Sequence, residues 1–303
     1  MSASQSSPDP ADRASLHDRM LEAVTQIEES LNRPGQGPQR PCFPRWVSWL
    51  ADDDDGGKLT VLACPQGDAR SALATGIVSE FLKATRRVPS LAWFSLEASG
   101  VDAALRLLGL SAGLPPEKVA EGWASHRELI LVIEAANRLA SHTVLLDDAA
   151  LMSVTELRAR CVQWRELHGG CSPVLIDGVE SLQDREGWRW GTKTGTSESI
   201  ADSLRHLARD LATPVVVLAT QPPEPGESEK EELLGHLMGR ADKRAWMEIG
   251  DPDPRTGVAP ATLRVEASDG ECQESGIRLL FRRDLTRFEP QGNWEDEGSE
   301  AGG

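Results

Sequence analysis

The sequence has no long apolar run and no hydrophobic segment at its start. No stretch approaches the roughly 18 residues needed to cross a bilayer, and the N-terminus, MSASQSSPDPADR, is polar. These absences exclude a transmembrane span and a secretion signal, so we expect a cytoplasmic protein with no membrane partner. The 303 residues, 39% hydrophobic and 26% charged, are typical of a globular chain with one large domain or two small ones.

The sequence also lacks cysteines and histidines at the spacing of metal ligands. The five cysteines are widely spaced and include no C-x-x-C pair, and the six histidines have no ligand spacing. This pattern excludes a disulfide framework and a zinc site. It favours cysteines that are reduced and structural.

Positive charge is scarce, and the net charge is −16. Such an excess opposes contact with nucleic acid, because phosphate contacts need Lys and Arg. Three acidic runs, each with a net charge of −4, carry 12 of the 16 excess charges: Asp52–Asp55, Glu224–Glu232 and 291–303. Their Gly, Pro or Ser content indicates solvated loops. The remaining surface is close to neutral, so charge gives no support to an anion site there.

Composition and periodicity divide the chain into four parts. Residues 1–14 are rich in Ser, Pro and Asp and are predicted to be disordered, as is the acidic tail 291–303. Apolar residues recur at helical spacing over 15–31, which predicts an amphipathic helix within a linker segment 15–33. Its apolar face packs either on its own domain or on a neighbouring protomer. The remaining residues, 34–290, form the main domain.

Within the main domain, buried strand patterns alternate with helical patterns. This alternation predicts an α/β fold with a mostly parallel central sheet flanked by helices, followed by an antiparallel C-terminal edge. Strands are expected at 59–64, 91–95, 143–146, 173–177, 214–219, 245–249, 261–266 and 277–282. Helices are expected at 70–85, 100–110, 116–122, 127–140, 153–168 and 197–212.

The first of these strands leads into a segment that stands where a phosphate-binding loop is expected. The loop pattern G-x-x-x-x-G-K-[ST] uses glycines to wrap backbone amides round phosphates, a lysine to neutralise charge and a hydroxyl to hold magnesium. Here the eight positions read Cys64-Pro65-Gln66-Gly67-Asp68-Ala69-Arg70-Ser71. Only Ser71 matches the conserved positions, and Asp68 adds a negative charge. Taken alone, an ordinary strand-turn-helix connection explains this segment better.

Polar residues at the ends of three further strands make the segment more informative. Glu97 follows the second strand, Asp177 ends the fourth, and Gln221 follows the fifth. Ligands of open α/β sheets gather at the carboxyl ends of strands. A carboxylate such as Glu97 could orient water, Asp177 could coordinate magnesium, and the Gln221 amide could sense a γ-phosphate.

Four segments closely resemble the RecA-like C-terminal domain of DnaB-family replicative helicases, of helicase superfamily 4. They are FSLEASGVDAALRLL (94–108), LLDDAALMSVTELRARCVQWRELHGG (145–170), PVLIDGVESLQ (173–183) and ESIADSLRHLARDLATPVVVLATQ (198–221). The likeness also covers the helix 15–33, which is similar to the family's linker helix that docks on the adjacent subunit of a ring. It ends near Phe288 and implies a RecA-like P-loop NTPase fold.

The resemblance implies a role for each matching position. The family's loop lysine and hydroxyl fall on Arg70 and Ser71, within a nucleotide-binding loop that includes Gly67, Asp68 and Ala69. Its catalytic glutamate falls on Glu97, its magnesium-organising aspartate on Asp177 with Ser71, and its glutamine sensor on Gln221. ATP and Mg²⁺ are the cofactors that this assignment implies.

The chain departs from the family at two cationic positions as well as in the loop. The family's K-x-R-x-G segment, which supplies positive charge to the neighbour's nucleotide, reads Glu266-Ala267-Ser268-Asp269-Gly270 here. Trans-acting arginines in P-loop enzymes contribute about 10³ to 10⁵ in rate. Arg70 keeps the charge of the lysine, but it is longer and forked. Nucleotide binding is therefore compatible with the sequence, whereas hydrolysis at helicase rates is not expected.

One segment is a candidate for contact with single-stranded DNA. Cations and aromatic residues alternate over 184–193, where the family places a loop facing the central channel, and such a mixture can stack bases and hold the backbone. The candidate contacts are Arg185, Trp188, Arg189 and Lys193. Covering the sheet edge is an equally good role for the two tryptophans of this segment, Trp188 and Trp190.

Two hypotheses of different classes remain. In the first, the chain is a DnaB-like ATPase that assembles into an oligomer or ring through helix 15–31 and moves on single-stranded DNA. In the second, it is a pseudo-ATPase that keeps the sheet and its interfaces and acts as a scaffold on a true replicative helicase. The retained acids favour the first hypothesis, and the altered loop and Glu266 favour the second.

Overall fold

A computed structural model of the chain describes residue 50 and residues 57–65, 67–84, 90–150, 152–183, 194–222, 229–267 and 272–291. All of them belong to one compact unit, Phe43–Gly303. The predicted N-terminal segment 1–14, the linker helix 15–33 and the acidic tail beyond residue 291 lie outside the described residues. Those predictions, and the exact start of the main domain, therefore stay untested.

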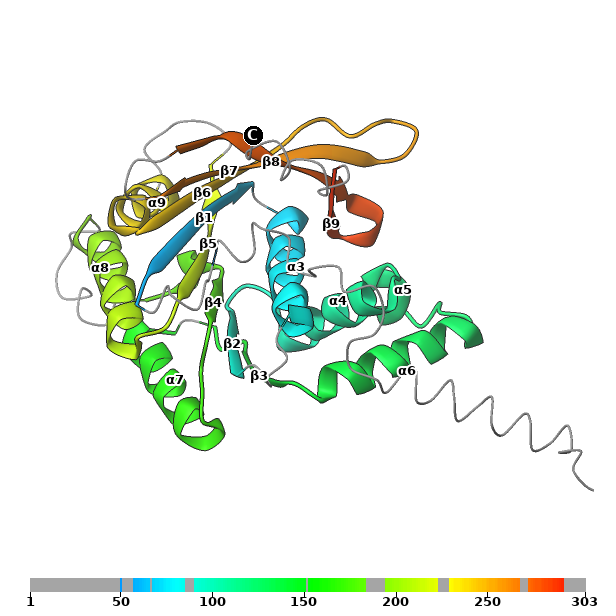
Figure 1. Cartoon of the computed structure of the whole chain (residues 1–303), viewed down its shortest axis with the longest axis horizontal. Helices are drawn as coiled ribbons and strands as arrows, with labels where there is room; N and C mark the ends of the chain where they lie inside the picture. The colour runs from blue at the N-terminus through cyan, green and yellow to red at the C-terminus, as the bar shows by residue number, and fades with distance from the viewer. Residues whose placement is uncertain are drawn as a thin grey trace, which may run out of the picture. The chain divides into compact units, whose positions relative to one another are not determined.

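The described chain is built on a mixed nine-stranded sheet in the order β3-β2-β4-β5-β1-β6-β7-β8-β9 (Figure 1). The strands from β3 to β6 pair in parallel, and those from β6 to β9 pair antiparallel. The bounds are β1 Leu59–Pro65, β2 Ser90–Ser95, β3 Thr143–Asp147, β4 Val174–Asp177, β5 Val215–Gln221, β6 Lys243–Ile249, β7 Val258–Ala267, β8 Cys272–Arg282 and β9 Arg287–Pro290. The predicted parallel sheet with an antiparallel C-terminal edge is confirmed.

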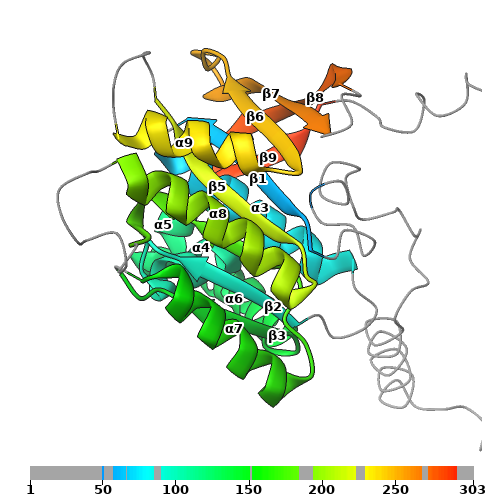
Figure 2. The same ribbon diagram turned by 90° about the vertical axis from the view of Figure 1, so that its left-hand side faces the viewer.

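Helices cover both faces of the parallel part of the sheet. Helices α3 to α6 lie on one side and α7 to α9 on the other, as two views show (Figures 1 and 2). The bounds are α3 Asp68–Ala84, α4 Gly100–Ala112, α5 Pro116–Ala120, α6 His126–Ala140, α7 Val154–His168, α8 Thr194–Leu211 and α9 Glu229–Arg240. No helix among the described residues is long and apolar enough to cross a membrane.

Successive side chains of a strand point to opposite faces of the sheet, so the apolar residues form two hydrophobic cores, one on each face. In β1, Leu62 and Cys64 pack on the α3 side, whereas Leu59 and Val61 pack on the side of α7 to α9. All four side chains are buried. A buried parallel strand needs apolar residues on both faces, which explains why this segment reads as a continuous apolar run.

Local signals place the helix ends. Ser125 and Ser153 each cap a helix, and Glu128 and Glu156 return the contact to the cap backbone, which completes a capping box at α6 and at α7. Gly169 ends α7 in the left-handed conformation. These signals lie in the sequence itself, so the predicted bounds of α6 and α7 agree closely with the structure.

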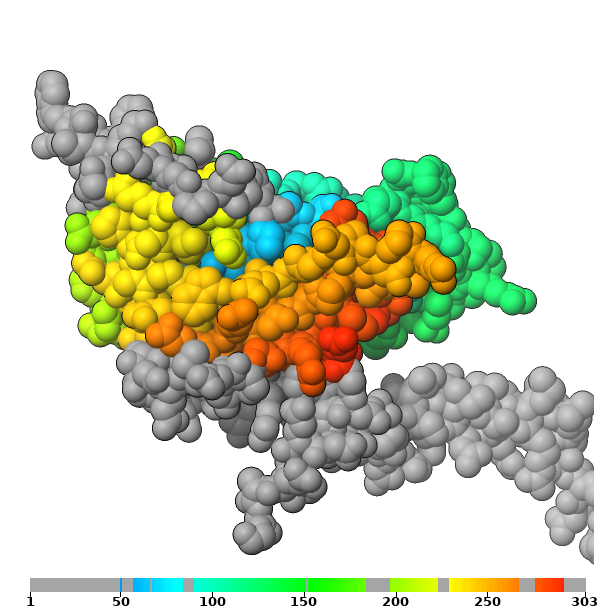
Figure 3. Space-filling view, turned by 90° about the horizontal axis from the view of Figure 1, so that it is seen from above, coloured from blue at the N-terminus to red at the C-terminus, as the bar shows by residue number. Residues whose placement is uncertain are grey.

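Helix α9 and strand β9 were not predicted. Helix α9 begins at Glu229, inside the acidic run Glu224–Glu232 that was predicted to be a solvated loop. The prediction of a loop is wrong for residues 229–232. Three glutamates stand in the first turn of α9, where carboxylates are favourable because the N-terminal end of a helix dipole is positive. The short strand β9 pairs with β8 and is the last strand at the antiparallel edge of the sheet. Strands β7, β8 and β9 lie at the surface seen in Figure 3.

The topology brings the ends of four strands together. Pro65 of β1 stands opposite Gln221 of β5, and Asp177 of β4 stands between Ser95 of β2 and Leu218 of β5. Because these strands are parallel, their carboxyl ends lie at one edge of the sheet. Helix α3 begins at this edge.

Candidate functional site

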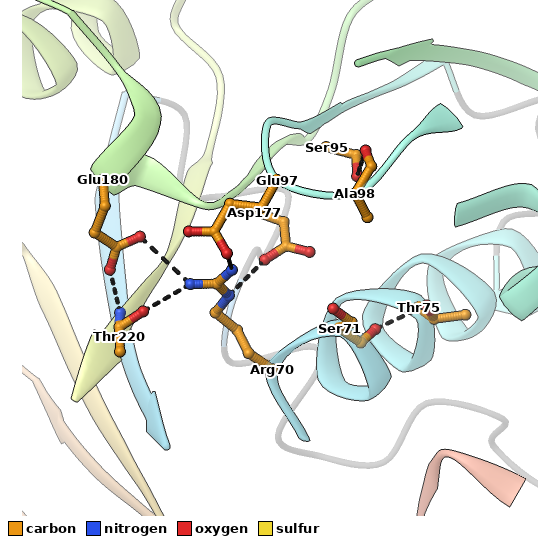
Figure 4. Close-up of polar contacts among 9 residues, drawn as sticks. All are labelled: Arg70, Ser71, Thr75, Ser95, Glu97, Ala98, Asp177, Glu180 and Thr220. Carbon is orange, nitrogen blue, oxygen red and sulfur yellow. Dashed lines mark hydrogen bonds and ion pairs between the residues drawn. The ribbon is translucent and has the colours of Figure 1, made fainter. Parts of the chain in front are cut away.

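The centre of the site is Arg70, in the first turn of α3. Helix α3 starts at Asp68, only three positions after β1 ends at Pro65. This tight connection directs the Arg70 side chain back over the ends of β2, β4 and β5 (Figure 4). Only 6% of the side chain is exposed. A buried guanidinium requires hydrogen-bonding and ionic partners.

Four side chains surround the guanidinium. Arg70 Nη2 donates to Glu97 Oε2 in a short contact, and Nη1 donates to Thr220 Oγ1 at 2.7 Å and to Glu180 Oε2 at 3.4 Å. Asp177 Oδ1 lies 2.9 Å from Nε. We call these five residues the Arg70 cluster. It joins α3, the end of β4, the end of β5 and the segments that follow β2 and β4.

The contact between Arg70 and Asp177 is an ion pair without hydrogen-bond geometry. Arg70 Nε and Asp177 Oδ1 are both buried and have no hydrogen bond, although they lie 2.9 Å apart. The guanidinium carries one positive charge, and the cluster holds three carboxyl groups. When all three are ionised, the cluster is therefore negative.

Burial and this excess of negative charge affect the titration of the cluster. Burial raises the pKa of Asp177 to about 6; Arg70 lowers it, and the charges of Glu97 and Glu180 raise it further. Burial also raises the pKa of the Cys64 thiol well above its usual value, with Asp177 as the second cause. Cys64 is consequently a neutral thiol at the position of the first loop glycine.

Glu180 and Thr220 were not predicted as site residues. Glu180 Oε1 accepts a short hydrogen bond from the Thr220 backbone N–H, while Oε2 accepts from Arg70. The sequence offered one signal for each: Glu180 follows Asp177 by three residues, and Thr220 precedes Gln221. Neither signal is specific, because the contact depends on the turn that follows β4.

That turn requires glycine at position 178. Gly178 has φ of +88°, and a Cβ there would lie 2.8 Å from Glu97 Cγ. It opens the 3-10 turn Val179–Ser181, in which Val179 is fully buried. The buried Val179 anchors the turn, and the turn directs Glu180 toward Arg70.

The other predicted loop residues line the start of α3. Gly67 has φ of +104°, and its carbonyl accepts from the Arg70 N–H at 3.2 Å. Asp68 is largely exposed and lies 3.8 Å from Arg106. Ala69 is buried, whereas Ser71 is half-buried. The structure thus brings the predicted residues Arg70, Glu97 and Asp177 into contact and places Ser71 and Gln221 nearby.

The candidate DNA contacts and Glu266 do not belong to the Arg70 cluster as the structure describes it. The candidate DNA contacts Arg185, Trp188, Arg189 and Lys193 lie outside the described residues, so that prediction stays open. Glu266, which stands at one of the family's cationic positions, has Arg244 Nη1 at 3.5 Å from its Oε1. Its charge is therefore partly neutralised within its own sheet.

A mostly parallel sheet with a strand-turn-helix connection and acids at the ends of neighbouring strands defines the class of RecA-like ATPase domains. Within that class, the family model described as "DnaB-like helicase C terminal domain" matches residues 54–225. This segment is more than half of the chain, and the protein belongs to that family.

Curated relatives agree with the family. The chain is 23% identical over 266 residues to the replicative DNA helicase DnaC of Bacillus subtilis, covering 86% of this chain and 55% of that protein. It is 30% identical over 199 residues to the replicative DNA helicase DnaB of Synechocystis, covering 65% of this chain and 21% of the relative. The chain thus spans about half or less of the length of these relatives.

Solved structures agree with the fold. A DnaB-like replicative helicase, described with its interactions with primase, superposes with a TM-score of 0.68 at 17% identity, covering 93% of this chain and 68% of the other. A second solved structure, described as an ATPase domain, superposes with a TM-score of 0.67 at 16% identity, covering 93% of this chain and all of that one.

Proposed function

We propose that this chain is a non-catalytic member of the DnaB family, a pseudo-ATPase that acts in DNA replication or repair as a scaffold on a true replicative helicase. The replication context comes from the family. The observation that carries the non-catalytic assignment is the Arg70 cluster, in which the residue at the lysine position is buried among acids of its own chain.

The charge of Arg70 is already neutralised by its own chain. A loop lysine in an active enzyme is a point charge that meets the β- and γ-phosphates. Here the guanidinium contacts three carboxyl groups and one hydroxyl. A triphosphate would have to displace these acids or add its own negative charges beside them. Asp68, at the loop, adds a further negative charge, which Arg106 at 3.8 Å offsets in part.

The residues also fit a magnesium ion poorly. Asp177, the expected magnesium-organising residue, is in contact with Arg70. Among the described residues, no three acids, histidines or cysteines are placed to share one metal ion. The three carboxyl groups lie around a planar guanidinium, which is larger than a metal ion. The arrangement of these carboxyl groups therefore does not suit Mg-ATP.

The active motor remains the second candidate, and one observation favours it. Glu97 is 41% exposed on its side chain, although it contacts Arg70. A carboxylate that is partly exposed can still reach water, which a catalytic glutamate needs. In this reading, nucleotide binding opens the Arg70 cluster, and Arg70 substitutes for lysine.

Assembly is proposed through helix 15–31, as in the family's rings. The described residues offer a surface for such a helix on α6, where Leu129, Ile130 and Ile133 are each about half exposed. They stand at helical spacing and form one apolar strip. Exposed apolar strips of this kind mark interaction sites.

The test of the function is calorimetric titration of the purified protein with Mg-ATP and a non-hydrolysable analogue, with phosphate release followed in parallel. Both measurements are made with and without single-stranded DNA. The matched variant is Glu97→Gln, which separates turnover at this site from a contaminating ATPase. We expect no binding at millimolar nucleotide and no release.

DNA-stimulated phosphate release that disappears in Glu97→Gln would establish the motor and refute the non-catalytic proposal. Release that is unchanged in Glu97→Gln comes from a contaminant. Co-sedimentation with a DnaB-family helicase tests the scaffold role separately, because a scaffold must bind its partner without nucleotide.

A further inference from the structure

The Glu180 carboxylate lies on a set of donors that is suited to a phosphoryl group. Its two oxygens accept from a guanidinium nitrogen of Arg70 and from the backbone N–H of Thr220. The Thr220 hydroxyl, which can also donate, accepts from the same guanidinium nitrogen. An arginine, a main-chain amide and an adjacent hydroxyl are donors that proteins commonly use for oxyanions.

We infer that Glu180 is an internal ligand, whose carboxylate occupies an oxyanion site formed by Arg70 and Thr220. The inference rests on the proposed non-catalytic function and names the residue that closes the site. Asp177 and Glu97 contact the other nitrogens of the guanidinium. Glu180 alone, among the residues of the Arg70 cluster, accepts from both Arg70 and the Thr220 amide.

The Thr220 amide is available because the neighbouring strand is short. Strand β4 ends at Asp177, opposite Leu218, so the ladder between β4 and β5 stops before Thr220. A buried amide beyond the end of a ladder needs another acceptor. Thr220 is 2% exposed, and Glu180 supplies that acceptor.

The backbone conformation of the turn Val179–Ser181 holds the Glu180 side chain beside Arg70 and Thr220. Gly178 opens the 3-10 turn, and buried Val179 anchors it in the core. Two backbone hydrogen bonds complete the turn: the Ser181 amide donates to the Gly178 carbonyl, and the Leu182 amide donates to the Val179 carbonyl. The Glu180 side chain is only 9% exposed. An external oxyanion at this place must therefore displace a carboxylate that is already oriented and largely dehydrated.

Removing the Glu180 carboxylate should open the site to an external oxyanion. In Glu180→Ala the Thr220 amide loses its acceptor, and Arg70 Nη1 loses its carboxylate partner and keeps the Thr220 hydroxyl. In Glu180→Gln the side chain keeps its size, but its amide nitrogen cannot accept from one of the two donors. The matched control is Glu97→Ala, which removes a carboxylate from the same guanidinium and leaves the hydrogen bond from the Thr220 amide to Glu180 in place.

Inorganic phosphate is the probe, titrated into the full chain by calorimetry at pH 7 against sodium chloride of equal ionic strength. We expect Glu180→Ala and Glu180→Gln to bind phosphate at least tenfold more tightly than wild type and Glu97→Ala. Their unfolding midpoints should rise by about 2–4 °C in excess phosphate. In NMR spectra, the Thr220 amide should shift on phosphate addition in these two variants only.

The inference is overturned if neither Glu180 variant gains phosphate affinity, if wild type binds equally well, or if Glu97→Ala gains as much. Circular dichroism establishes that each variant is folded, and Glu180→Gln decides the question if Glu180→Ala is not. These readouts use phosphate binding by variants. They are independent of phosphate release by wild type, which tests the proposed function.

Discussion

At the scale of single residues, the site depends on how a buried cation is neutralised. Replacing one partner of a buried ion pair typically costs about 3–5 kcal/mol, because the other charge is left unpaired. Arg70 has three acidic partners, so no single acid is required to neutralise it. Burial and the neighbouring negative charges instead raise the pKa of Asp177, so the folded chain keeps this proton to a higher pH than the unfolded chain does.

Stability should therefore depend on the Asp177 proton. Its pKa is raised from an ordinary value of 3.8 to about 6 by burial, so the folded chain binds a proton more tightly than the unfolded chain. The resulting stabilisation is fully present below pH 4 and is lost as pH rises through 6. We expect the free energy of unfolding of wild type, relative to Asp177→Asn, to fall by about 2 kcal/mol between pH 4 and pH 7.5.

Urea unfolding at four pH values measures this difference. Asp177→Asn cannot titrate, so the comparison isolates the Asp177 proton from other acids. Glu117→Gln, which removes an exposed carboxyl from α5, corrects for the change in net charge. A difference that stays constant or grows with pH would contradict the assignment.

At the scale of elements, the turn after β4 links the sheet to the cluster. Gly178 lies in the left-handed region, directly after Asp177 and beside Glu97. The same three-residue turn buries Val179 in the core and directs Glu180 to Arg70. Backbone conformation here determines which acids meet the guanidinium.

Gly178→Ala should therefore destabilise the fold by about 1–3 kcal/mol, since a Cβ is unfavourable at positive φ and would lie 2.8 Å from Glu97 Cγ. The matched control is Gly235→Ala in α9, where a Cβ meets nothing within 4 Å. That change should stabilise by about 0.5–1 kcal/mol, because alanine favours a helix interior. Urea unfolding of both variants tests the pair, and equal effects would show that the turn tolerates a side chain.

At the scale of the whole molecule, the exposed strip on α6 and the predicted helix 15–31 have matching apolar character. The strip lies on the same side of the sheet as α3 and α4 (Figure 1). If helix 15–31 of one copy packs on α6 of another, deleting residues 1–33 should reduce the mass of a higher-order species to that of a monomer in light scattering.

Ile133→Asp in α6 should have the same effect as the deletion, because a charge would be buried without a partner. Leu167→Asp in α7 is the matched control, since Leu167 is also exposed but lies on the other side of the sheet. A mass that is unchanged by the deletion and by Ile133→Asp would mean that the predicted helix packs on its own domain.

The fold was accessible from sequence because its signals are local. Continuous apolar strands such as Val215–Gln221 and capping boxes such as Ser153 with Glu156 need no information from distant residues. Helix α9 was missed because the acidic run at its start has the composition of a loop. Its helical turns are stabilised by tertiary packing of Leu233 and Leu237.

The amino-acid pattern alone was enough to identify the family, the order of strands β1 to β8 along the chain and the polar residues at the ends of the parallel strands. It also placed an arginine where the family has a lysine. The contacts of that arginine became known from the folded chain, because its partners lie 27 to 150 positions away in the sequence. Parallel pairing and the Gly178 turn bring them together, and the low-dielectric interior then makes the ion pairs strong enough to hold Arg70 in place.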